Sequence, residues 1–141
     1  MRINALVDGY PREGVSSFAS ALERFYEFYC HVVAAFSGIP HEQMASAWKA
    51  VGKQSERQLG IFIASALLLT KQCPPLLNPG REVKFRNAVI HGGYIPTLEE
   101  AISFGDVVMD KINESLQTLR QLVPDALTTT YERLSPVEKK E

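Results

Sequence analysis

Three polar side chains of different chemistry stand close together in one stretch of the chain. Arg86, Asn87 and His91 lie within six positions, and Gly92-Gly93 follows them. A guanidinium can grip a phosphate with paired hydrogen bonds and can stabilise charge that builds there in a transition state. An imidazole can take or give a proton near neutral pH, and a carboxamide can orient the phosphate or the imidazole. These residue types predict phosphodiester chemistry on RNA that needs neither a metal ion nor a cofactor.

Helical geometry indicates how these side chains would point. At about 100° per residue, Asn87 and His91 fall at one edge of a helix, and Arg86 falls in the middle of its apolar face. An arginine keeps its charge, so Arg86 needs a carboxylate or a phosphate there. Glu23 and Glu27 are the candidate supporting carboxylates, and a purely structural ion pair with one of them is the plain alternative. For His91 the plain alternative is a helix C-cap favoured by the helix dipole.

Substrate contacts are expected from residues around this edge. Lys84 and Arg81 would supply a local positive charge, and Tyr94 could stack on a base. The net charge of the chain is only −1, so any attraction for RNA must be local. Ordinary charged surface and ordinary aromatic packing are the alternatives for these residues.

One histidine cannot readily act as both base and acid in a single concerted step. Two copies of the chain that meet across a two-fold axis would supply two histidines. The chemistry therefore favours a homodimer with a composite site.

The rest of the sequence predicts helices. Apolar residues recur at three- and four-residue steps, and no run alternates as a strand would. Capping boxes at Ser55/Gln58 and Thr97/Glu100, Asn78 before Pro79, and Pro124 mark helix starts. The expected helices cover 15–36, 41–51, 55–69, 79–91, 98–123 and a short segment from 124. We expect one all-α domain over 1–141, with an irregular lead-in at 1–14, a frayed tail at 135–141, and two long antiparallel helices flanked by short ones.

The segment Arg86-Asn87-Ala88-Val89-Ile90-His91 is similar to the R-N-x-x-x-H form of the R-x4-6-H motif of HEPN domains. The likeness spans roughly Val15 to Val123 and includes a long first helix, a motif helix that ends at the two glycines, and a second long helix after Pro96. It implies a dimerising bundle of four to five helices. It also implies a metal-independent endoribonuclease that leaves a 2′,3′-cyclic phosphate, with Arg86 and His91 catalytic and Asn87 supporting them.

The same resemblance suggests a setting. Members often serve in toxin–antitoxin, CRISPR-associated or anti-phage defence systems, so an antitoxin or a nucleotidyltransferase partner is conceivable. Some members carry H-x-Y, whose tyrosine a nucleotidyltransferase modifies, whereas here Tyr94 stands one residue later. The rival hypothesis is a catalytically silent HEPN-like module that binds a nucleotide or a partner protein.

Composition sets the remaining expectations. Apolar residues make up 45% and charged residues 22% of the chain, as in ordinary globular domains. No apolar run reaches the roughly 20 residues of a membrane span, and no signal peptide is visible at the N-terminus. We therefore expect a cytoplasmic protein.

Overall fold

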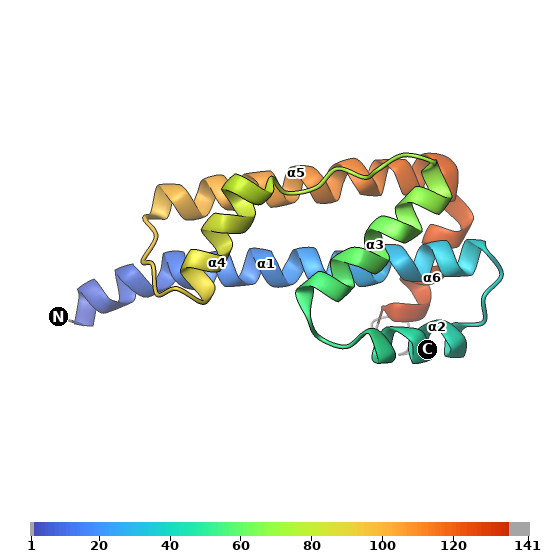
Figure 1. Cartoon of the computed structure of the whole chain (residues 1–141), viewed down its shortest axis with the longest axis horizontal. Coiled ribbons are helices and arrows are strands. Elements are labelled where there is room, and N and C mark those ends of the chain that lie inside the picture. Colours follow the sequence, from blue (N-terminus) through green and yellow to red (C-terminus); the bar gives the residue numbers. More distant parts are fainter. Residues whose placement is uncertain (1, 136–141) are drawn as a thin grey trace. The chain divides into compact units, whose positions relative to one another are not determined.

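The structure is a computed structural model that describes residues 2–135, with side-chain positions from residue 10 onward. Within that range 81% of the chain is helical and no strand occurs, which confirms the all-α class. The elements in order are α1 (Arg2–Phe36), α2 (His41–Val51), α3 (Ser55–Thr70), the π-helical turn η1 (Pro79–Val83), α4 (Lys84–Ile90), α5 (Leu98–Leu122) and α6 (Pro124–Leu134), as Figure 1 shows. The predicted frayed tail falls almost wholly outside the described residues.

The chain divides into two compact units, each built from segments far apart in sequence. The described part of unit 1 comprises residues 2–22 and 75–113, and that of unit 2 comprises residues 23–74 and 114–135. The helices α1 and α5 each contribute their first part to unit 1 and their second part to unit 2. That 1–141 forms a single domain stays a prediction.

The core of unit 1 joins α1, α4 and α5. Its buried apolar side chains are Val15, Ala19, Leu22, Leu77, Val89, Ala101, Phe104 and Val108. Gly105 lets α1 approach closely, because a Cβ at this position would lie 2.3 Å from Cε2 of Phe18.

The core of unit 2 is built around aromatic rings. The ring of Phe62 stacks on Tyr26 with centroids 4.2 Å apart and meets Tyr29 edge-on at 4.9 Å. Val32 and Leu119 are also fully buried. Such paired aromatic contacts contribute about 0.5–1.5 kcal/mol beyond the area they bury.

The two long helices run parallel, so the expected antiparallel pair is wrong. In unit 1 the first parts of α1 and α5 point the same way, and so do their second parts in unit 2 (Figure 1). Antiparallel pairing follows when a short loop joins two helices. Here residues 37–97 separate them, and this segment includes α2, α3 and α4, so no such constraint applies.

The predicted irregular lead-in at 1–14 is also wrong, because α1 already begins at Arg2 and passes through Pro11. A proline inside a helix loses one hydrogen bond and costs about 3 kcal/mol. Pro11 is itself buried, on the face that also buries Val15 and Ala19. Burial of large apolar side chains, at roughly 1.5–3 kcal/mol each, offsets that cost.

Most predicted helix starts are confirmed in atomic detail. The amide of Glu100 donates to Oγ1 of Thr97 at 3.0 Å, and the amide of Thr97 donates to Oε1 of Glu100 at 2.9 Å. The capping box at Ser55 is wrong although the helix does begin there, because the Ser55 hydroxyl donates to Oε2 of Glu23 at 2.7 Å.

Candidate functional site

The turn η1, which runs directly into the motif helix α4, is held at its start by Asn78. Oδ1 of Asn78 accepts from the amide of Gly80 at 2.8 Å, and Pro79 follows it as predicted. The amide of Asn78 in turn donates to Oε1 of Glu82 at 2.8 Å. These two bonds satisfy donors that a helix start leaves open, and they fix where η1 begins.

Inward packing of α4 comes from Phe85 and Val89. Val89 is fully buried, and the Phe85 ring meets that of Phe104 on α5 at 5.7 Å. Ile90, expected on the same side as Arg86, is 41% exposed. The buried face of α4 is therefore turned toward Phe85 and Val89. Arg86 lies half-buried beside this face and not in its middle as predicted.

Arg86 and Asn87 are joined directly. Nε and Nη2 of Arg86 both donate to Oδ1 of Asn87, at 3.3 Å and 3.2 Å. A guanidinium has five N–H donors, so three stay available for another acceptor such as a phosphate. The sequence predicted that Asn87 orients the phosphate or the imidazole, whereas in the structure its amide oxygen contacts the guanidinium of Arg86. Its predicted contacts with phosphate and imidazole stay a prediction.

His91 is the C-cap residue of α4 and its side chain is exposed. Its backbone amide donates to the carbonyl of Asn87 at 2.9 Å. His91 therefore does occupy the C-cap position that the purely structural alternative assigned to it. An exposed imidazole at a helix end is also open to a substrate, so the position fits both readings.

The glycines after His91 form a tight turn. Gly93 has a φ of 76°, which favours glycine, and the amide of Tyr94 then donates to the carbonyl of Ala88 at 2.9 Å. This turn brings the Tyr94 ring to the edge of the Phe85 ring, with centroids 6.2 Å apart.

Tyr94 is engaged through its hydroxyl, which donates to Oε1 and Oε2 of Glu100 at 2.9 Å and 3.0 Å. The hydrogen bond raises the pKa of Tyr94 above its usual range. The pKa of Glu100 is lowered, first by the bond from the Thr97 amide and then by the bond from Tyr94. Tyr94 is half exposed, so its ring can still meet a base, but its hydroxyl is occupied.

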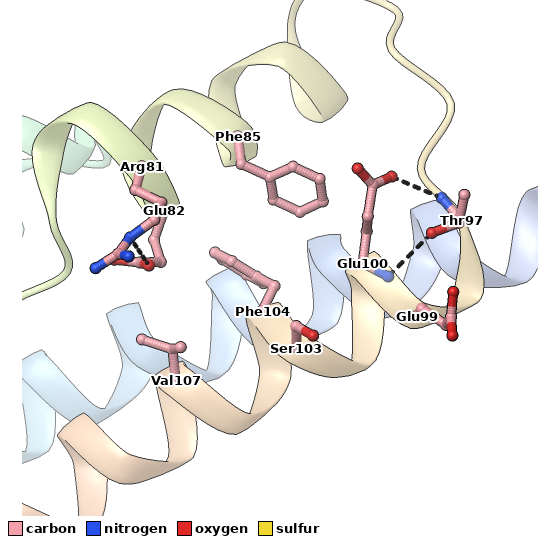
Figure 2. Close-up of a pocket in the computed structure, with 9 residues that line it drawn as sticks. All are labelled: Arg81, Glu82, Phe85, Thr97, Glu99, Glu100, Ser103, Phe104 and Val107. Atoms are coloured by element: carbon pink, nitrogen blue, oxygen red, sulfur yellow. Dashed lines mark hydrogen bonds and ion pairs between the residues drawn. The ribbon is translucent and has the colours of Figure 1, made fainter.

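The predicted basic contacts differ in their surroundings. Lys84 is exposed, while Nε of Arg81 lies 3.1 Å from Oε2 of Glu82. Arg81 also borders a cavity of about 440 Å³, which sequence reasoning missed (Figure 2). Its walls include the aromatic rings of Phe85 and Phe104. These residues lie far apart in sequence, so only the folded chain reveals the cavity.

Glu23 and Glu27 have partners within unit 2. Glu23 accepts from Ser55, and Oε2 of Glu27 lies 3.9 Å from Nε2 of His31. Burial raises the pKa of Glu27. Arg86 belongs to unit 1, so its pairing with either glutamate stays a prediction.

No protein-family model matches the chain, no curated protein matches it, and no solved structure matches it. Among residues 2–135, no helix is both long enough and apolar enough to cross a membrane.

Proposed function

We propose that the chain is a metal-independent endoribonuclease of the HEPN type that acts as a homodimer with a composite site. The observation that carries this proposal is the Arg86–Asn87 pair on α4, with the exposed His91 at the end of the same helix. The order of Arg86, Asn87 and His91 in the sequence, which is similar to the R-N-x-x-x-H motif of HEPN domains, also supports the proposal. A toxin–antitoxin or anti-phage role, with an antitoxin or nucleotidyltransferase partner, belongs to the same proposal.

Each motif residue then has a defined part in the reaction. The guanidinium of Arg86 holds the scissile phosphate and stabilises its growing negative charge. Asn87 fixes the guanidinium through its amide oxygen. One His91 accepts the proton of the 2′-hydroxyl as the 2′-oxygen bonds to phosphorus. The His91 of the second copy protonates the 5′-oxygen as its bond to phosphorus breaks, which leaves a 2′,3′-cyclic phosphate and a 5′-hydroxyl.

The direct experiment incubates purified protein with single-stranded RNA in EDTA and follows cleavage and product ends. General acid–base catalysis contributes about 10²–10⁴-fold, so His91→Ala is expected to lose at least about 100-fold. Arg86→Ala is expected to lose a similar factor. Arg86→Lys retains the positive charge but loses the paired N–H donors of the guanidinium, so it should be little more active than Arg86→Ala.

The matched control is Arg12→Ala, which removes an exposed arginine from α1 in the same unit. It should cut like the wild-type protein. Circular dichroism and the mass in solution establish that each variant is folded and assembled. An inert wild-type protein on varied RNAs, or a His91→Ala variant that cuts normally, overturns the proposal.

The cavity beside α4 favours a second candidate function, a silent module that binds a nucleotide or a partner protein. Its volume falls in the usual range for ligand pockets, and its two phenylalanine rings offer an aromatic surface. Under this alternative, calorimetry with nucleotides gives binding that is lost in Phe104→Ala and retained in His91→Ala, and no RNA is cut.

A further inference from the structure

A second cavity, of about 470 Å³, lies within unit 2 and is lined by the end of α1, the loop after it, α2, α3 and the residue that ends α3. Its volume falls in the usual range for ligand pockets. None of its wall residues belongs to the motif helix α4 or to the cavity beside Phe85. We call it the unit 2 cavity, and it shares no residue with the sites described above.

The buried part of its wall is uncharged and carries Cys30, Ala34 and Met44. The hydroxyl of Ser65 donates to Sγ of Cys30 at 3.6 Å, so these two polar groups satisfy each other. Burial raises the pKa of the Cys30 thiol to about 11, which keeps it neutral. A charged group would lose its hydration here without gaining a partner. This part of the wall therefore suits a hydrocarbon group.

The opening of the unit 2 cavity is also apolar, although its side chains meet solvent. Three large wall residues are strongly exposed: Phe36, Ile39 and Leu68. Leu68 is 79% exposed, the highest value among the large apolar side chains that the structure describes. Apolar side chains that gather at the surface mark binding sites more often than scattered ones do. A ligand with a hydrocarbon chain would cover both the opening and the buried wall.

Among the described residues, Lys71 is the one charged residue in this wall, and its exposure places it at the opening. Within residues 2–135 its ammonium makes no ion pair. A ligand that fills the cavity therefore meets a single positive charge, at the end where the cavity meets water. A carboxylate complements that charge and stays hydrated there.

The backbone of Lys71 would favour a different residue. Its φ of 65° and ψ of 20° are left-handed, and no other non-glycine residue in the described part of the chain has a positive φ. Glycine is the usual residue for this conformation at a helix end. What lysine adds over glycine is its side chain and charge, beside the cavity. The plain alternative is that this charge serves only the dipole of α3.

We infer that the unit 2 cavity binds a free, unbranched fatty acid. The hydrocarbon chain lies along the buried wall at Cys30 and Met44, and Leu68 covers it at the opening. The carboxylate pairs with the ammonium of Lys71. The inference concerns binding alone and does not depend on nuclease activity.

The first test titrates the full chain with decanoate and follows isotope-labelled methionine methyl groups by NMR. The Met44 signal is expected to move, because Met44 lines the cavity. The signal of Met109, an exposed residue of α5 in unit 1, is the internal control and should stay. From octanoate to dodecanoate the affinity should rise about fourfold per methylene until the cavity is full. An unmoved Met44 signal, or equal movement of both signals, overturns the inference.

Variants of Lys71 test the pairing with the carboxylate. Lys71→Gly relieves the left-handed backbone, so it should raise the unfolding temperature of the free protein. It should also weaken decanoate binding about fivefold. Lys71→Arg keeps the charge and should keep the affinity. Decylammonium, which has the same chain and the opposite charge, should bind more weakly than decanoate. Unchanged decanoate affinity in Lys71→Gly, or equal affinity for decylammonium, overturns the inference.

Two neighbouring leucines of α3 test the location. Leu68 lines the cavity, whereas Leu67, 48% exposed, does not. Leu68→Asn should weaken decanoate binding about tenfold through lost apolar contact, and Leu67→Asn, the matched control, should leave it unchanged. Both positions are exposed, so both variants should fold. Equal weakening by the two variants places the ligand elsewhere and overturns the inference.

Vesicles distinguish a free fatty acid from a lipid surface. Vesicles of phosphatidylcholine and phosphatidylglycerol present acyl chains and negative charge, but their chains are held in a bilayer. The protein should not sediment with them, and its Met44 signal should stay where it was. Sedimentation with the vesicles, in a protein whose Met44 signal does not respond to decanoate, overturns the inference in favour of a lipid surface.

Discussion

Tyr94 illustrates how a residue after a helix can be tied to the next helix. Its hydroxyl bonds to both carboxylate oxygens of Glu100, which also caps α5 through Thr97. The turn at Gly93 makes this contact, and the ring of Phe85 supports it. The sequence indicated both the turn and the capping box, but not that one glutamate would serve Tyr94 as well.

The Tyr94→Phe variant tests this link. It removes the hydroxyl donor and keeps the ring, so the pKa of the Glu100 carboxyl should rise toward its usual value. The pKa should stay partly lowered, because the stronger contribution comes from the Thr97 amide. Carboxyl titration by NMR measures it, with Tyr131→Phe as the control. An unchanged Glu100 titration would show that the hydroxyl bond is not formed in solution.

His31 is a buried titratable group of unit 2. It is 7% exposed, and its ring centroid lies 5.7 Å from that of His41. Burial lowers its pKa below the usual 6.5, and the positive charges of His41 and Arg133 add to the effect. Glu27, 3.9 Å away, faces the same ring. The folded chain therefore favours the neutral imidazole.

The sign of the pH effect follows. The unfolded chain protonates His31 at a higher pH than the folded chain does, so the free energy of unfolding should fall as pH drops below 6.5. Urea titrations across this range measure the slope, which His31→Gln should flatten. The raised pKa of Glu27 gives an opposite slope nearer 4.5. Equal slopes in the wild-type protein and His31→Gln would contradict this account.

Among the helices, the sequence predicted where each one begins and ends better than it predicted which residues of different helices contact one another. Local signals such as Asn78-Pro79 and Thr97 with Glu100 act within a few residues, so they can be recognised without the fold. The prediction of an irregular segment around Pro11 was wrong, because burial of apolar side chains, which depends on distant residues, outweighs the local cost of a proline inside a helix. The prediction of a capping box at Ser55 was wrong for the same reason, since its hydroxyl bonds to Glu23 on another helix.

Gly105 carries the close contact between α1 and α5 in unit 1. Gly105→Ala gains up to about 1 kcal/mol of helix propensity, but it forces the Phe18 ring to shift, and overpacking costs about 1–3 kcal/mol. We expect a net loss of about 1 kcal/mol in the free energy of unfolding. Chemical denaturation measures it, and Phe18→Leu combined with Gly105→Ala should lose less than the sum of both.

Gly14 provides the matched control, because it is also helical and a Cβ there meets no atom within 4 Å. Gly14→Ala should stabilise the protein. If Gly105→Ala stabilises it by the same amount, the Phe18 contact does not constrain the helix pair.

At the scale of the whole molecule, two units share their longest helices. The motif helix α4 belongs to unit 1, while α2 and α3 belong to unit 2. The sequence located the three motif residues and their common helix. It could not show that Arg86 bonds to Asn87 or that a cavity opens beside Phe85, because rotamers and long-range neighbours decide both.

In the proposed reaction, Arg86, Asn87 and His91 cut RNA through its 2′-hydroxyl without a metal ion. The most direct test presents the protein, in EDTA, with two otherwise identical oligonucleotides, one of RNA and one in which every 2′-hydroxyl is replaced by hydrogen. The account predicts that only the RNA is cut, that its products end in 2′,3′-cyclic phosphate, and that His91→Ala leaves it intact. Cleavage of both oligonucleotides, of neither, or of the RNA by His91→Ala would contradict it.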